Sequence, residues 1–301
     1  MHYGKNNSAE FKKVYVKIRE ASESGKIILP VSLFHLEEIM IRMNKPQRIK
    51  LIEFMTMISQ GWSLKPYVFF VWKEIENAVF RNLGKQPLYD IHSEIIGRGL
   101  TDLMGSKFKL VPKNPSVPVS KEKLEKLTEL VKSPEIMARL LGIDPASDEF
   151  KKMRKDTIET AEVMEEIRIE KSFIKDRDRR YREAAVQYFA DIIVPVLARM
   201  PSKYGIPKEV IMPIGREALE RFLEDMPSTN VAFRLVNSRD LLERPIKTSD
   251  IGDINHLAGA IPYCDIVVFE KMFSNLAIQN KLDKKYDCII LSSLEALSKC
   301  I

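Results

Sequence analysis

Hydrophobic positions recur at three- and four-residue steps over most of the chain, which is the spacing of one face of a helix. The first such stretch covers residues 9–24, just before Gly25, and further ones cover residues 33–41 and 47–60. Residues 67–72 are apolar and aromatic, and they fit either a strand or the start of a helix. The pattern predicts that the N-terminal third is rich in helices.

Three short β-branched runs interrupt the helical pattern. They are Lys26–Leu29, Cys264–Phe269 and Asp287–Leu291. Continuous apolar runs of this length are typical of strands buried in a parallel sheet, and strands separated by helices are joined by right-handed crossovers. We therefore expect an α/β fold, with a ligand site beyond the carboxyl ends of the strands.

The middle of the chain has a different composition. Three prolines between Pro112 and Pro118 predict a linker, and the residues from about 121 to 199 are charged and helical, with one long helix over 148–176. The sequence thus predicts one α/β unit formed by residues 1–110 and 226–301, and a helical insertion formed by residues 111–225.

Composition narrows the class of protein. The chain has 301 residues, of which 45% are hydrophobic and 30% are charged, so it has enough apolar material for a packed core. No apolar run reaches the roughly 20 residues that cross a bilayer, and the first residues do not resemble a secretory signal. The three cysteines form no CxxC pair, which excludes a zinc finger and a disulfide framework. We expect a cytoplasmic protein that does not bind membranes.

The net charge is +6, from 48 basic and 42 acidic residues. A positive potential attracts nucleic acid, but a mixture this even is also typical of an ordinary solvated surface. The same two interpretations apply to a basic cluster within residues 171–182. No Walker A loop, GxGxxG loop or nucleophile elbow is present, so nucleotide hydrolysis and serine hydrolase chemistry have little support.

Acidic residues gather around the predicted strands. Glu37 and Glu38 follow the first strand, Asp250 and Asp253 precede the second, and Glu270 comes just after it. Crowded carboxylates are stabilised by a hard divalent cation such as Mg²⁺ or Mn²⁺, and a bound metal ion activates water for attack on phosphate. By spacing alone, each of these residues is also typical of a helix cap or a surface charge.

Two segments resemble the PIN-like nuclease family. Residues 249–271, which contain Ala-Ile-Pro-Tyr-Cys-Asp, are similar to the C-terminal motif of that family, and Pro-x-Ser at residues 30–32, followed by His35 and Glu38, is similar to a segment of one bacterial subfamily. The resemblance covers both ends, about half of the chain. It implies a three-layer fold around a parallel sheet and a metal-dependent nuclease that hydrolyses phosphodiester bonds, in RNA in preference to DNA.

The resemblance also implies which residues bind Mg²⁺ or Mn²⁺. It assigns the catalytic metal ligands to Glu38, Asp253 and Glu270, and makes Asp265 a candidate for an additional inner-shell or structural role. Asp250, which shares a helix face with Asp253, is expected to help bind the metal. Glu270 stands where aspartate is more common, and Phe269 replaces a small hydroxyl residue. The family begins with a central strand that ends in aspartate, and nothing before Ala9 matches it. Either the start is assigned too late or that strand has been lost, and we expect the sheet to close around the gap or to remain open there.

Several alternatives stay open. Ser32 is predicted to cap the helix that follows it. His35 and Glu38 are spaced to bind a transition metal, but His35 also fits a packed helix residue. His256 follows Asp253 by one turn, where it either orients that carboxylate or is buried and bonded to the backbone. The alternative function is a non-catalytic PIN-like module that binds nucleic acid or a partner protein. A homodimer and a role as a toxin or in phage defence are also typical of the family.

Overall fold

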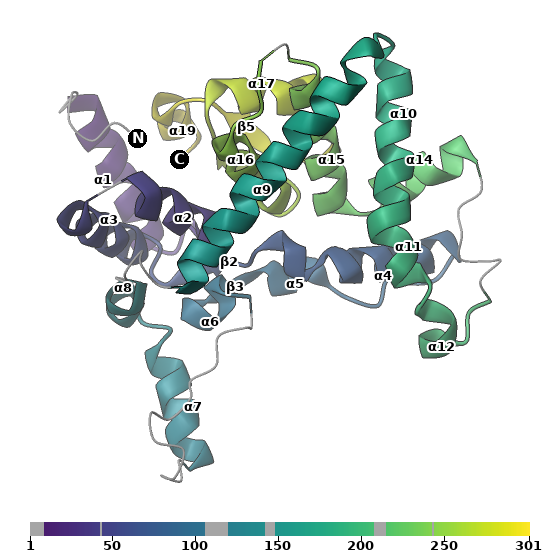
Figure 1. Ribbon diagram of the computed structural model, residues 1–301. Helices are drawn as coiled ribbons and strands as arrows, with labels where there is room; N and C mark the ends of the chain where they lie inside the picture. Colours follow the sequence, from purple (N-terminus) through teal and green to yellow (C-terminus); the bar gives the residue numbers. More distant parts are fainter. Residues whose placement is uncertain (1–8, 43, 106–119, 142–147, 208–214, 243) are drawn as a thin grey trace.

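The computed structural model describes residues 9–42, 44–105, 120–141, 148–207, 215–242 and 244–301 (Figure 1). The chain is mostly helical, with two small sheets, and belongs to the α/β class in its broadest sense. None of the described helices combines the length and the apolar character needed to cross a membrane. The predicted linker lies outside the described residues.

The strands form two separate sheets. In the first, β1 (Val31–Ser32) is parallel to β2 (Trp62–Leu64), which is antiparallel to β3 (Ile96–Arg98). In the second, β4 (Ile266–Val268) is parallel to β5 (Ile289–Leu291). Among the described residues β1 and β4 do not pair, so the described strands do not form the one continuous sheet that the sequence predicted.

The strand predicted at Lys26–Leu29 is wrong. Residues 27–30 form no strand, and β1 begins at Val31, after Pro30. Proline has no N–H to give to a sheet, and Ile28 is 46% exposed, so this β-branched run does not enter the core. The other two predicted strands are confirmed in shorter form as β4 and β5.

Helices of the N-terminal third follow the predicted periodicity. Their bounds are α1 (Ala9–Glu23), α2 (Leu33–Arg42), α3 (Lys45–Ile58), α4 (Val71–Asn82), α5 (Ile91–Ile95) and α6 (Gly99–Leu103). The ambiguous residues 67–72 form a 3₁₀ turn, η1 (Tyr67–Phe69), and then the start of α4, so their helical interpretation is confirmed. Gly25 ends the first helical stretch with a positive φ of 71°, a conformation that favours glycine.

The middle of the chain is helical, as expected. Its elements are α7 (Lys121–Leu130), α8 (Pro134–Leu141), α9 (Asp148–Glu170), η2 (Lys171–Phe173), α10 (Arg177–Tyr188), η3 (Phe189–Ile193), α11 (Val194–Leu197), α12 (Met200–Tyr204) and α14 (Arg216–Glu224). The long helix ends six residues before its predicted end at Asp176. The Asp176 side chain accepts hydrogen bonds from the N–H groups of Asp178 and Arg179, and so begins α10 as a separate helix.

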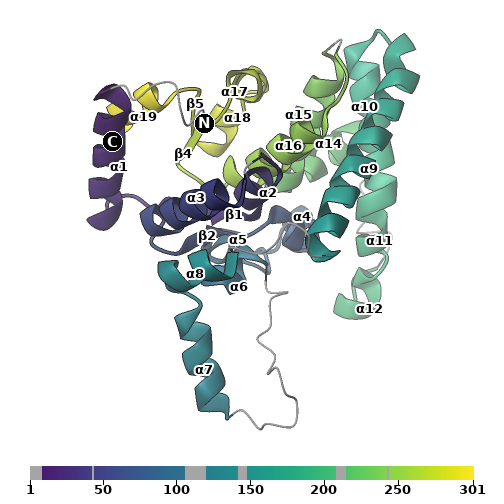
Figure 2. The same cartoon turned by 60° about the vertical axis from the view of Figure 1, so that its left-hand side comes forward.

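In the described part of the C-terminal third, five further helices follow. They are α15 (Pro227–Asp240), α16 (Thr248–Ala260), α17 (Lys271–Gln279), α18 (Leu282–Tyr286) and α19 (Leu294–Cys300). The last of them lies beside α1, where Lys17 Nζ donates to the carbonyl of Ser298 at 3.0 Å. The two ends of the described chain therefore meet, on the opposite side of the molecule from α9, α10 and α11 (Figure 2).

The middle helices share a core with the rest of the chain. Ile75 and Val79 of α4 belong to the same buried cluster as Leu197, Phe222 and other residues of the middle segment. In addition, α9 packs along α16. The segment predicted as an insertion is thus built into the packing of both ends of the chain.

Candidate functional site

The two segments that carry the predicted site residues meet where α2 packs against α16. Ser32, the last residue of β1, is at the centre of this contact. Its Oγ lies 3.1 Å from Nδ1 of His35 and 3.0 Å from Nε2 of His256. The two imidazole rings meet edge to face, with centroids 4.1 Å apart. We call these three residues the serine–histidine cluster.

The serine–histidine cluster lies at the carboxyl ends of β1 and β4. Ser32 ends β1, and Phe269, which directly follows β4, has its ring centroid 5.8 Å from that of His256. The ring of Phe34 packs against His256 as well, at 6.2 Å. This is the end of the strands at which open α/β sheets bind their ligands.

Hydrogen bonding and burial define the protonation of the two histidines. The N–H of Ser32 donates to Nδ1 of His35 at 3.1 Å, so the proton of that neutral ring is on Nε2. Burial lowers the pKa of His35 to about 4. Burial, together with the neighbouring His35, holds the pKa of His256 well below its ordinary value. Both rings are therefore neutral at pH 7.

The predicted residues Glu38 and Asp253 each lie one helical turn from a contacting histidine. Glu38 follows His35 on α2, and Asp253 precedes His256 on α16, so each shares a helix face with its histidine. The side chain of Glu38 is exposed and that of Asp253 is partly buried. The contact between α2 and α16 thus brings together the two helices that carry them.

Asp265 and Glu270 are exposed and lie at opposite ends of β4. Asp265 precedes the strand, whereas Glu270 occupies the position just before α17, on the same side as Phe269. Five residues of extended chain span about 16 Å. The structure therefore places Glu270, but not Asp265, at the end of β4 where the serine–histidine cluster lies.

The predicted ligand Asp250 is buried and paired with Arg239. Its Oδ2 accepts from Nε of Arg239 at 2.9 Å, from Nη2 at 2.6 Å, and from the N–H of Lys247 at 2.9 Å. Arg239 is fully buried, and its guanidinium also donates to the carbonyls of Arg244 and Pro245. Asp250 thus caps the first turn of α16 and links this helix to α15. Its negative charge is balanced by Arg239, which the spacing of acidic residues in the sequence does not reveal.

Glu37, adjacent to Glu38, has a strongly perturbed carboxyl group. Burial raises the pKa of Glu37 to about 7. Spacing indicated Glu37 together with Glu38, but the resemblance gives the role of metal ligand to Glu38 alone. Two adjacent glutamates look alike in sequence, and only the packing of α2 shows which one is the more buried.

We expect Glu37 to lower the stability of the protein as the pH rises from about 4.5 to about 7. Its folded-state pKa is about 7 against an ordinary value of 4.5. The stabilisation from its protonated form is therefore complete below pH 4.5 and is lost as the pH rises through 7. Urea unfolding at several pH values between about 4 and 8 measures this slope, which Glu37→Gln should remove.

A matched control is available one residue away. Glu38→Gln makes the same chemical change at an exposed position of the same helix, so a comparison of the two variants separates the effect of burial from that of removing a carboxyl group. The same pH dependence in the wild-type protein and in Glu37→Gln would show that another group causes it.

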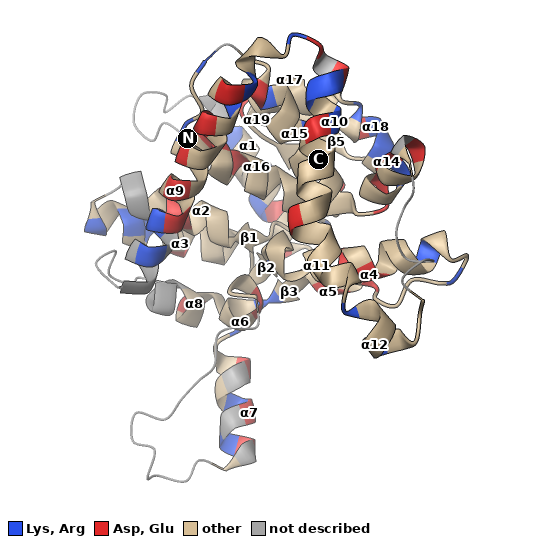
Figure 3. Cartoon of the chain, turned by 45° about the vertical axis from the view of Figure 1, so that its right-hand side comes forward, with Lys and Arg blue, Asp and Glu red and all other residues tan. Residues whose placement is uncertain are grey.

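Basic residues are interspersed with acidic ones over the described helices (Figure 3). Within the basic cluster near η2, Arg180 Nη1 is 3.2 Å from Asp240, and Arg179 Nε is 2.9 Å from Glu183. Two of its cations are thus neutralised by neighbours, which favours the interpretation of this cluster as a solvated face.

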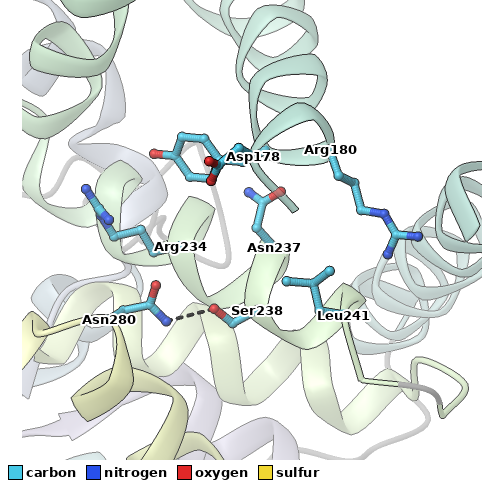
Figure 4. Close-up of a pocket in the computed structure, with 8 residues that line it drawn as sticks. Asp178, Arg180, Arg234, Asn237, Ser238, Leu241 and Asn280 are labelled. Carbon is cyan, nitrogen blue, oxygen red and sulfur yellow. Dashed lines mark hydrogen bonds between the residues drawn. The ribbon is translucent and has the colours of Figure 1, made fainter. Parts of the chain in front are cut away.

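A pocket of about 200 Å³ lies between α10, α15 and the end of α17 (Figure 4). Its lining is polar and consists of Asp178, Arg180, Tyr181, Arg234, Asn237, Ser238, Leu241 and Asn280. Arg234 is paired with Glu224 at 2.7 Å, and Asn280 donates to Ser238 Oγ at 2.7 Å. Because most of its polar groups are already paired, this pocket is a weaker candidate than the serine–histidine cluster.

No three histidine, cysteine, aspartate or glutamate side chains in the described part of the chain are grouped to hold a metal ion. Comparisons with protein-family models, with curated proteins and with solved structures found no match.

Proposed function

We propose that this chain is a metal-dependent nuclease that hydrolyses RNA. The observation that supports this most is the contact of Ser32 with His256, which are 224 residues apart in the chain. It joins the two segments that resemble PIN-like nucleases, and it does so at the carboxyl ends of β1 and β4. The resemblance implies that these segments form one site, and their packing agrees with that.

The proposed ligands of Mg²⁺ or Mn²⁺ are Glu38, Asp253 and Glu270, which do not form a ready-made metal-binding group in the described part of the chain and would have to be drawn together by the ion. All three are carboxylates, which these hard cations prefer, and they are carried by α2, α16 and the residue before α17. A bound ion would activate water and stabilise charge on the phosphate. We leave out Asp250, because Arg239 already neutralises it, and Asp265, because it lies at the far end of β4.

The proposal is tested by incubating the full chain with end-labelled single-stranded RNA and with DNA of the same sequence. We expect cleavage of RNA in the presence of Mn²⁺ or Mg²⁺, less cleavage of DNA, and none in EDTA. Cleavage that persists in EDTA would exclude metal dependence. The absence of cleavage with either ion would exclude the nuclease.

A second function is favoured by the separation of the two sheets. In the described structure β1 and β4 do not pair, and the predicted ligand Asp250 forms an ion pair with Arg239. Both features are expected for a PIN-like module that binds RNA or a partner without cutting it. RNA or partner binding in EDTA, without cleavage in Mn²⁺, would identify this function. A homodimer, a cytoplasmic location and a role as a toxin or in phage defence stay predictions.

A further inference from the structure

We propose that the serine–histidine cluster is a positioning device that fixes how α2 and α16 are rotated about their axes, and thereby where Glu38 and Asp253 point. This inference rests on the proposed function. It assigns Ser32, His35 and His256 a role in the site without contact to substrate or metal.

Ser32 is bonded to both helices at once. It directly precedes α2, and the N–H of His35 donates to its Oγ at 3.4 Å, while its own N–H donates back to Nδ1 of His35. The same hydroxyl contacts Nε2 of His256 on α16 at 3.0 Å. A single hydroxyl group therefore couples the start of α2 to the middle of α16.

The rotation of α16 is fixed on two sides. Asn255 Oδ1 accepts a hydrogen bond from the hydroxyl of Tyr67 on η1 at 3.1 Å, and the next residue, His256, contacts Ser32 on β1. Adjacent positions on a helix differ in direction by about 100°. Asn255 and His256 are hydrogen-bonded to different elements, η1 and β1, so the two bonds together oppose rotation of α16 about its axis. Asp253 lies about 60° from His256 around the helix, so its direction is set by the same contacts.

Burial separates this role from a catalytic one. Ser32 is 3% exposed, so its hydroxyl cannot reach a phosphate of a nucleic acid. Both histidines are neutral, and His256 packs against the rings of Phe34 and Phe269. Loss of the hydroxyl would leave a buried ring nitrogen without its partner, and the helices would repack to satisfy it.

The first test compares two buried serines on neighbouring strands. Ser63 on β2 is in register with Val31 of β1, is fully buried, and donates to the carbonyl of Gly99 at 3.0 Å without contact to a histidine. We expect Ser32→Ala to lower kcat for RNA cleavage and the affinity for Mn²⁺ by about 10–100-fold, with little change in KM. Ser63→Ala, which loses an equally buried hydrogen bond, should leave both quantities near those of the wild-type protein.

The second test replaces His256. The amide group of glutamine reaches the position of Nε2, so His256→Gln keeps a hydrogen-bonding group for Ser32, whereas His256→Leu fills the space without one. Mn²⁺ binding, followed by electron paramagnetic resonance, should be weakened strongly by the leucine and recovered in part by the glutamine.

The outcomes distinguish the inference from the proposed function. A wild-type protein that neither binds Mn²⁺ nor cleaves RNA overturns both, before any variant is compared. An active wild-type protein in which Ser32→Ala behaves like Ser63→Ala, or His256→Gln like His256→Leu, keeps the nuclease and overturns the positioning role. Separation of both pairs in the expected direction supports it.

Discussion

Arg239→Met is expected to lower the free energy of unfolding by about 3–5 kcal/mol. Arg239 is fully buried and pairs with Asp250, which is 4% exposed, through two contacts to one carboxylate oxygen. Methionine fills much of the space but leaves Asp250 as a buried charge without its partner. Urea unfolding at pH 7, followed by circular dichroism, measures the loss, which is large against the total stability of a domain.

Two further variants identify the cause. Arg239→Met combined with Asp250→Leu removes both charges, and should recover much of the stability because apolar replacement of a whole buried ion pair is often neutral. Arg19→Met is the control, since Arg19 and Glu23 form an exposed pair on α1 at 2.6 Å, and solvent screening should make its effect on stability small. Equal losses from Arg239→Met and Arg19→Met would mean that the buried pair does not hold α15 to α16.

The helices could be predicted from sequence because their signals are local. The spacing of apolar residues in α1, α2 and α3 and the end of the first helical stretch at Gly25 depend on only a few neighbouring residues. The arrangement of the strands could not be predicted in this way. Whether β1 pairs with β4, and whether the run before Pro30 is buried, depends on segments far apart in the chain.

The candidate site shows the same division. Sequence patterns indicated Glu38, Asp253 and His256, and the structure brings the helices that carry them together. The sequence did not indicate that Asp250 forms an ion pair. Its partner Arg239 lies on the preceding helix, α15, and the two side chains meet only because the chain turns back between α15 and α16. Ser32 was expected only as a helix cap, since its second partner is 224 residues away.

Asp253→Asn should reduce Mn²⁺-dependent cleavage of RNA by about 100-fold or more. Asparagine keeps the size of the side chain and one oxygen, but it removes the negative charge that a divalent cation requires. Asp253 lies on α16, one turn from the histidine that contacts Ser32, so its loss acts where the two segments meet. Single-turnover cleavage rates at saturating protein report the change in the chemical step.

The control for this variant is Asp156→Asn, which removes the same charge from an exposed position on α9. Both variants make the net charge more positive by one unit, so a general electrostatic effect on RNA binding would affect them equally. A loss confined to Asp253→Asn, with an unchanged unfolding midpoint, would assign the effect to the site. Unchanged cleavage in Asp253→Asn would remove Asp253 from the proposed metal ligands, and with it the reason for placing the nuclease site between α2 and α16.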